Sequence, residues 1–121
     1  QIVEYHDGGG RGPCLNFGAK HAKGRVYAFC HSDVVLPPHW DAKILNALSD
    51  TKGGSVVVNA CAFGFGIDTS KEGLRGGRCP PGVKAINFTV NLRTRFFSLP
   101  YGDQVISLRA NVFEYLGGFP Q

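Results

Sequence analysis

The residues with the clearest chemical potential follow one short apolar segment. Val26–Cys30 combines aromatic and β-branched residues and lies between turn signals, a pattern typical of a buried strand. It is followed by His31-Ser32-Asp33, so Asp33 is the first carboxylate beyond the predicted strand. Ligands of open α/β sheets bind beyond the carboxyl ends of the strands. Asp33 is therefore a candidate ligand or metal contact. The alternative is that it only caps the turn that leads to Pro37-Pro38.

Other chemistry-bearing residues give weaker signals. The glycine-rich stretch 7–13 lacks the spacing of a phosphate-binding loop. The cysteines match no zinc pattern and the histidines show no ligand spacing. Cys30 and Cys61 lie inside apolar runs and are expected in the core. The cysteine usage favours a reducing, intracellular setting, although an even count also permits two disulfides.

Length and composition bound the class of protein. The chain has 121 residues, of which 43% are hydrophobic and 18% charged, as in one folded domain. No apolar run approaches the length of a membrane-spanning helix. The net charge of +4 could favour an anionic ligand or a membrane surface, but no Lys/Arg-rich run points to nucleic acid. The chain contains no Met, which indicates processing or a fragment.

Hydrophobic periodicity predicts elements that would position these residues. We expect helices over 14–23, 39–49 and 112–116, the last capped by Asn111. Strands are expected over 2–5, 55–65 and 105–109, and a long loop over 66–82. Segment 83–98 is ambiguous. Its alternating apolar and polar residues favour a strand, but it is long for one.

Several motifs together resemble family 2 glycosyltransferases. They occur in the same order and at similar spacing as in one bacterial-type branch of that family, although loop 66–82 does not match well. The motifs are Asn16-Phe-Gly-Ala-Lys-His-Ala-Lys-Gly24, His31-Ser-Asp33 followed by Leu36-Pro-Pro, Asn91-Leu-Arg-Thr-Arg95, Leu99-Pro-Tyr-Gly-Asp-Gln104 and Leu116-Gly-Gly-Phe-Pro120.

The resemblance implies a GT-A fold, a mainly parallel sheet with flanking helices. Residues 1–121 would form a single, incomplete domain of this type, with a helix over 83–98. It implies transfer of a sugar from a nucleotide-diphosphate donor to an acceptor hydroxyl, with inversion. The acceptor is not identified, and a lipid-linked acceptor is one option. The implied location is cytoplasmic, with peripheral contact to a membrane as a further option, and no nucleic acid is implied as a partner.

The resemblance also implies roles for individual residues. Asp33 matches the last carboxylate of the family's Asp-x-Asp metal motif and would bind Mg²⁺ or Mn²⁺, while His31 replaces the first Asp. Asp103 is the candidate catalytic residue, which would orient the acceptor hydroxyl; the alternative is a turn residue. The remaining candidates are Asn16, Gly118 and Phe119 on the donor side, with Asp33, and Gly102, Gln104 and Arg93 on the acceptor side. Arg93 and Arg95 could meet phosphate or lipid headgroups, or be solvated surface charges.

Two departures from the family leave other functions open. The family's first strand with its aspartate loop, and the Glu-Asp pair that follows Gly-Gly-Phe-Pro, are not in this sequence, so we expect no sugar transfer by this stretch alone. A non-catalytic nucleotide-sugar or phosphate-binding module is the alternative, and His31 in place of an acid supports it. A structural α/β domain without a ligand is the third option.

Overall fold

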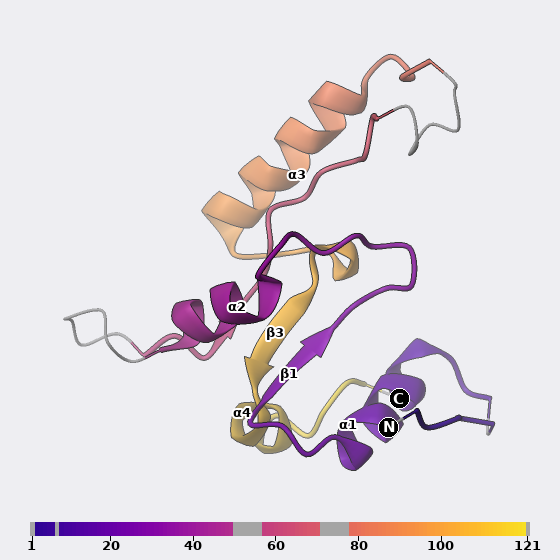
Figure 1. Cartoon of the computed structure of the whole chain (residues 1–121), viewed down its shortest axis with the longest axis vertical. Coiled ribbons are helices and arrows are strands. Elements are labelled where there is room, and N and C mark those ends of the chain that lie inside the picture. The colour runs from indigo at the N-terminus through magenta and orange to yellow at the C-terminus, as the bar shows by residue number, and fades with distance from the viewer. Residues whose placement is uncertain (1, 7, 50–56, 71–77, 121) are drawn as a thin grey trace.

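The computed structural model describes residues 2–6, 8–49, 57–70 and 78–120. Figure 1 shows how its helices and strands are arranged. In chain order they are α1 (Arg11–His21), β1 (Val26–Phe29), α2 (Trp40–Leu48), β2 (Ala60–Cys61), α3 (Val83–Phe97), the 3₁₀ turn η1 (Gly102–Gln104), β3 (Ile106–Arg109) and α4 (Ala110–Tyr115).

The three strands form one sheet in the order β1-β3-β2. Leu108 of β3 lies opposite Tyr27 of β1 and opposite Ala60 of β2, and both pairings are antiparallel. The mainly parallel sheet expected from the sequence is therefore not found among the described strands. β1 and β2 do run in the same direction, but β3 separates them and runs the opposite way. The periodicity of residues in the sequence carries no information on strand direction, so the antiparallel direction of β3 is evident only from the path of the chain.

Helices cover both faces of the sheet. Because side chains alternate along a strand, Leu108 and Ser107 point to opposite faces. On the Leu108 face, Ala19 of α1 and Phe113 of α4 complete a core with Leu108. On the other face α2 lies against β2 and β3 and buries Ile44 and Leu48. The order of layers is thus α1 with α4, then the sheet, then α2.

Aromatic rings make up most of the larger core. Phe113 lies 5.7 Å from Tyr27, 5.1 Å from Phe29 and 5.6 Å from Phe119, measured between ring centroids. Rings at these separations add edge-to-face attraction to the burial of apolar area. This cluster fixes α4, and the segment after it, against the carboxyl end of β1.

Segment 83–98 is helical, as the family resemblance implied, and α3 extends away from the sheet (Figure 1). Its polar residues explain why the alternation was misleading. Asn91 donates to the Phe65 carbonyl and accepts from the Phe65 amide, both at 2.8 Å. Asn87 accepts from the Ile67 amide at 3.2 Å. Residues four apart thus form one helical face, and that face holds the 63–67 backbone.

Some expected elements are wrong or shorter than predicted. Residues 2–5 form no strand, because the sheet places no partner beside them. Of the strand expected over 55–65, only Ala60–Cys61 pairs, while residues 55 and 56 lie outside the described part. The predicted helix over 112–116 begins at Ala110, with Arg109 rather than Asn111 at the N-cap. The predicted loop 66–82 holds no helix or strand in its described residues, 66–70 and 78–82.

The cysteines also differ from expectation. Cys30 is exposed, since it follows the end of β1 and its thiol donates to the His31 carbonyl at 3.3 Å. Cys61 is partly buried, and desolvation raises the pKa of its thiol. All four cysteines are free. Among the helices in the described part of the chain, none is long and apolar enough to cross a membrane.

Replacement of Phe113 should show how much this cluster contributes. We expect Phe113→Ala to lower the free energy of unfolding by about 3–5 kcal/mol, because it removes a buried ring and leaves a cavity. Tyr115→Ala is the matched control, as Tyr115 belongs to the same helix and is 90% exposed. Chemical denaturation monitored by circular dichroism gives both values. Equal losses for the two variants would contradict this description of the core.

Candidate functional site

Two of the predicted site carboxylates line the same cavity. Asp33 comes from the turn after β1 and Asp103 from η1, and both border a cavity of about 740 Å³. The Val34–Pro38 segment and the loop 63–68 form the other walls. The chain thus brings residues that are 70 positions apart to one concave surface beyond β1.

His31 connects this cavity to α1. Its Nδ1 lies 3.2 Å from Asp103 Oδ1, and its Nε2 lies 3.2 Å from Arg11 Nη1. A guanidinium group can only donate, so Nε2 must accept from Arg11. Nδ1 then carries the hydrogen and lies close to the Asp103 carboxylate. The imidazole therefore links a cation on α1 to a carboxylate in η1.

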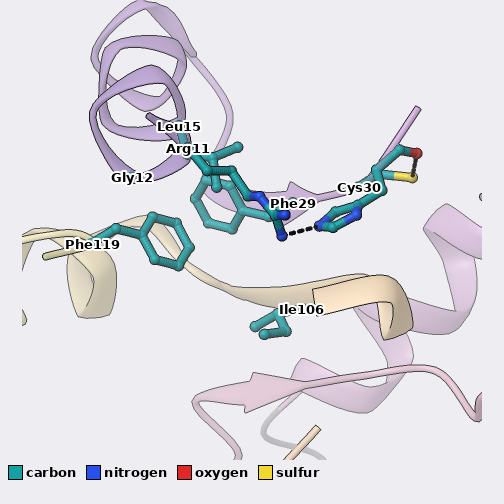
Figure 2. A pocket seen from close by; sticks show the side chains of 8 residues that line it. Arg11, Gly12, Leu15, Phe29, Cys30, Ile106 and Phe119 are labelled. Carbon is teal, nitrogen blue, oxygen red and sulfur yellow. Dashed lines mark hydrogen bonds between the residues drawn. The ribbon is translucent and has the colours of Figure 1, made fainter. Parts of the chain in front are cut away.

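A second cavity, of about 390 Å³, lies on the other side of His31. Figure 2 shows its apolar walls, formed by Leu15, Phe29, Ile106 and Phe119, with Arg11 at the rim. The dashed line there between two nitrogen atoms is the Arg11–His31 hydrogen bond. Anionic side chains therefore gather in the first cavity, whereas the second offers a cation above an apolar floor.

Of the four predicted donor-side residues, Asn16, Gly118 and Phe119 lie in direct contact, whereas Asp33 lines the first cavity. The Asn16 side chain donates to the Phe119 carbonyl and accepts from the Phe119 amide, both at 2.9 Å. Gly118 has φ +81°, and a Cβ at this position would lie 2.6 Å from Asn16 Oδ1. Only glycine suits this backbone and this close approach. The Asn16 amide thus fixes Phe119 as a wall of the second cavity.

Gln104 is buried rather than open to either cavity. Only 1% of it is exposed. Its Oε1 accepts from the Tyr101 amide at 2.8 Å and from Thr94 Oγ1 at 3.0 Å, while Nε2 donates to the Phe63 carbonyl at 3.0 Å. The structure therefore gives Gln104 a positioning role. Gly102 begins the same 3₁₀ turn, whose middle residue is Asp103.

Arg93, like Gln104, lines neither cavity. Its guanidinium carbon lies 4.2 Å from the centre of the Tyr101 ring, a cation–π contact. It therefore braces the turn before Asp103 from the side of α3. Its predicted contact with the acceptor is not visible in this arrangement.

Sequence reasoning missed two residues of the site. Arg11 lies in the glycine-rich stretch that matched no phosphate-loop spacing, and its contact with His31 depends on the path of the whole chain. Asp68 lines the first cavity with Asp33 and Asp103. Hydrogen bonds from the Ser70 backbone and side chain lower the pKa of the Asp68 carboxyl, and the Ser70 amide donates at 2.8 Å. The Asp68 carboxylate accepts from the amide two residues further on, as in an Asx turn. The Asp-Thr-Ser motif was therefore the sequence signal that could have identified Asp68.

Comparison with known proteins assigns the family. The family model for glycosyl transferase family 2 matches residues 2–116. The chain belongs to glycosyltransferase family 2. No curated protein and no solved structure matches it. Family membership establishes glycosyl transfer as the general activity and the GT-A type as the fold class.

A divalent metal, common in family 2, can be tested against the residues present. Within the described ranges, no group of three or more His, Cys, Asp or Glu side chains could enclose an ion. Mg²⁺, however, is commonly held by one or two carboxylates, with waters and substrate phosphates supplying the other oxygens. Asp33 is exposed and faces the larger cavity, so it fits this open mode of binding and not an all-protein cage.

The Asn16–Phe119 contact can be tested through Gly118. Gly118→Ala should cost about 1–3 kcal/mol more unfolding free energy than Gly117→Ala, because only the first introduces a clash. Gly117 is the matched control: its φ is +78°, and no atom lies within 4 Å of a Cβ placed there. In an Asn16→Ala background the difference between the two variants should vanish. A difference that persists there would show that Asn16 is not the obstructing group.

Proposed function

We propose that this chain carries the donor and acceptor site of an inverting, divalent-metal-dependent glycosyltransferase that uses a nucleotide-diphosphate sugar. The observation that carries the proposal is the shared cavity of Asp33 and Asp103, joined to Arg11 through His31. A metal-bound diphosphate and an acceptor hydroxyl must meet at the anomeric carbon, so carboxylates on two sides of one cavity suit this reaction.

Asp33 would hold the metal ion. It lies where a strand of the sheet ends, is exposed, and faces the cavity. When bound, the Mg²⁺ or Mn²⁺ neutralises charge that develops on the leaving diphosphate. His31 replaces the first acid of the family motif, and its ring nitrogens are occupied by Arg11 and Asp103. Asp33 is accordingly the one protein carboxylate that we assign to the metal.

Asp103 would act on the acceptor side. Its Oδ1 lies 3.2 Å from His31 Nδ1, and Oδ2 would accept from the acceptor hydroxyl and orient that oxygen toward the sugar. Gly102 and the buried Gln104 set the 3₁₀ turn that presents this carboxylate. Arg93 supports the turn through Tyr101, in place of the direct acceptor contact expected from the sequence.

The smaller cavity would receive the sugar-phosphate part of the donor. Its rim offers the Arg11 guanidinium, which suits phosphate oxygens, and Phe119 supplies an apolar wall for a sugar ring. Asn16 and Gly118 serve the donor indirectly, by holding Phe119 in place. The proposal includes a lipid-linked molecule as one class of acceptor.

A non-catalytic nucleotide-sugar-binding module remains the second candidate. It is favoured by His31 at a position where the family motif has an acid. Such a module would bind nucleoside diphosphates but would not turn over any nucleotide-sugar. Binding and turnover measured on the same preparation therefore distinguish the two functions.

The metal assignment predicts the effect of Asp33→Asn. This change should reduce Mn²⁺-dependent affinity for nucleoside diphosphates by about tenfold or more, since it removes the only protein charge on the ion. Asp41→Asn is the matched control, because Asp41 is an exposed carboxylate in the first turn of α2. Titration calorimetry with UDP, GDP, CDP and ADP, with and without Mn²⁺, provides the affinities. Unchanged affinity in Asp33→Asn would refute the assignment.

The acceptor-side role predicts the effect of Asp103→Asn. In the full-length enzyme, with a nucleotide-sugar and acceptor that it turns over, kcat should fall by about 10²-fold or more, as expected when a positioned carboxylate is lost. Donor affinity should change little, since Asn keeps the size of the side chain. A nucleotide-release assay measures both parameters. Intact kcat would mean that Asp103 is only a turn residue.

A further inference from the structure

The polarity of α3 is inverted relative to an ordinary surface helix. Its polar stripe, Asn87, Asn91 and Thr94, faces the protein. Asn87 and Asn91 bind the backbone of the 63–67 loop, and Thr94 donates to Gln104. Surface helices usually bury their apolar stripe instead. Of the residues in α3, only Val83 is buried.

The apolar stripe of α3 therefore faces outward. Phe88, Leu92 and Phe96 recur at every fourth position, so they lie in one row along the helix. Phe88 is 66% exposed and Phe96 is 71% exposed. The large side chains that follow, Phe97 and Leu99, are exposed as well. The row is contiguous, unlike the single apolar residues that are scattered over most protein surfaces.

Cations accompany this stripe. Lys84 and Arg95 lie four residues before Phe88 and three residues after Leu92, so they flank the same face, and both are exposed. Segment 83–97 contains no Asp or Glu. A helix with an apolar face, flanking cations and no acids matches the composition of helices that lie in a membrane interface.

We propose that α3 is a docking surface for an anionic membrane, with Phe88, Leu92 and Phe96 entering the headgroup boundary and Lys84 and Arg95 contacting lipid phosphates. The helix extends away from the sheet, so that its outward face is not covered by the sheet or by α1, α2 and α4 (Figure 1). At about 1.5 Å per residue it is too short to cross a bilayer but can lie along one.

Charge argues against a second copy of the chain as the occupant. A two-fold contact places the same patch of both copies together, so Lys84 and Arg95 would meet the equivalent cations. The membrane surface supplies the opposite charge instead. The proposal does not require glycosyl transfer, because vesicle binding is measured without turnover. A failure of vesicle binding would therefore leave the proposed function unaffected. A failure of glycosyl transfer would likewise leave the membrane proposal unaffected.

Co-sedimentation with vesicles tests the surface. The protein should bind phosphatidylcholine vesicles that contain one-third phosphatidylglycerol, and should bind pure phosphatidylcholine much more weakly. Lys84→Gln with Arg95→Gln should weaken binding to the anionic vesicles by about 25-fold, at about fivefold per cation. Lys20→Gln with Lys23→Gln is the matched control, because these exposed cations belong to the end of α1 and the residues after it. Equal losses for the two pairs would overturn the assignment to α3.

The apolar stripe needs its own variants. Phe88→Ser with Phe96→Ser should weaken binding by more than about tenfold, whereas Tyr115→Ser, an exposed aromatic on α4, should not. A second readout does not depend on replacing large apolar side chains by serine, and it keeps an aromatic residue at position 96. In Trp40→Phe with Phe96→Trp the only tryptophan lies on α3, and its emission should shift to shorter wavelength with anionic vesicles.

Absence of that shift would overturn the proposal, as would wild-type vesicle binding by the double serine variant. Sedimentation velocity without lipid tests the remaining alternative, that a second copy of the chain covers this face. Dimerisation that Phe88→Ser with Phe96→Ser abolishes would show that a second copy covers this face, and would also overturn the proposal.

Discussion

The geometry of the site depends on the hydrogen bonds that the buried Gln104 side chain makes. It joins three segments: Thr94 of α3, the Tyr101 backbone before η1, and Phe63 beyond β2. A buried amide that lost these partners would cost about 1–3 kcal/mol of desolvation, so the three segments are held together. Asp103 is the residue immediately before it. The turn that Gln104 fixes therefore decides where that carboxylate points.

The site has a clear division of charge. His31 lies between two cavities, and its two ring nitrogens contact a cation on one side and a carboxylate on the other. The larger cavity carries Asp33, Asp68 and Asp103, while the smaller has Arg11 at its rim. Such a division suits a donor whose diphosphate needs a cation and whose sugar must face an acceptor. Family membership provides the general reaction, and the cavities suggest where each part of the substrates would lie.

The sequence predicted the helices and the motif residues better than the sheet. Helical periodicity located α2 within one residue at each end, because its apolar side chains repeat every three to four positions. Small residues on one face, with Gly24 as a stop signal, located α1 within three residues. Segment 83–98 shows where this approach fails. Its alternation resembles a strand, but Asn87 and Asn91 form a polar helical face that holds a loop. Strand direction was also beyond the sequence, since the central position of β3 is set by the path of the chain.

For the site, motif order grouped Asn16, Gly118 and Phe119 on one side, and these residues do lie in contact. It could not reveal that Asn16 acts through the Phe119 backbone, nor that Gln104 is buried. Arg11 escaped because its role comes from a contact with His31 across 20 positions, in a stretch whose glycine spacing matched no motif. Individual residue types at recognisable spacing were therefore predictable, whereas links between distant segments required the structure.

The most direct test of the central claim is paramagnetic broadening by Mn²⁺ in a ¹⁵N-resolved NMR spectrum, recorded in the presence of a nucleoside diphosphate. The proposed site predicts that amide signals near Asp33, Asp68 and Asp103 broaden first. Signals near Glu114 and Tyr115, on α4 outside the Asp33 cavity, should remain sharp. Broadening centred elsewhere, such as at the exposed Glu4–His6 pair, or no broadening with the diphosphate present, would contradict the account.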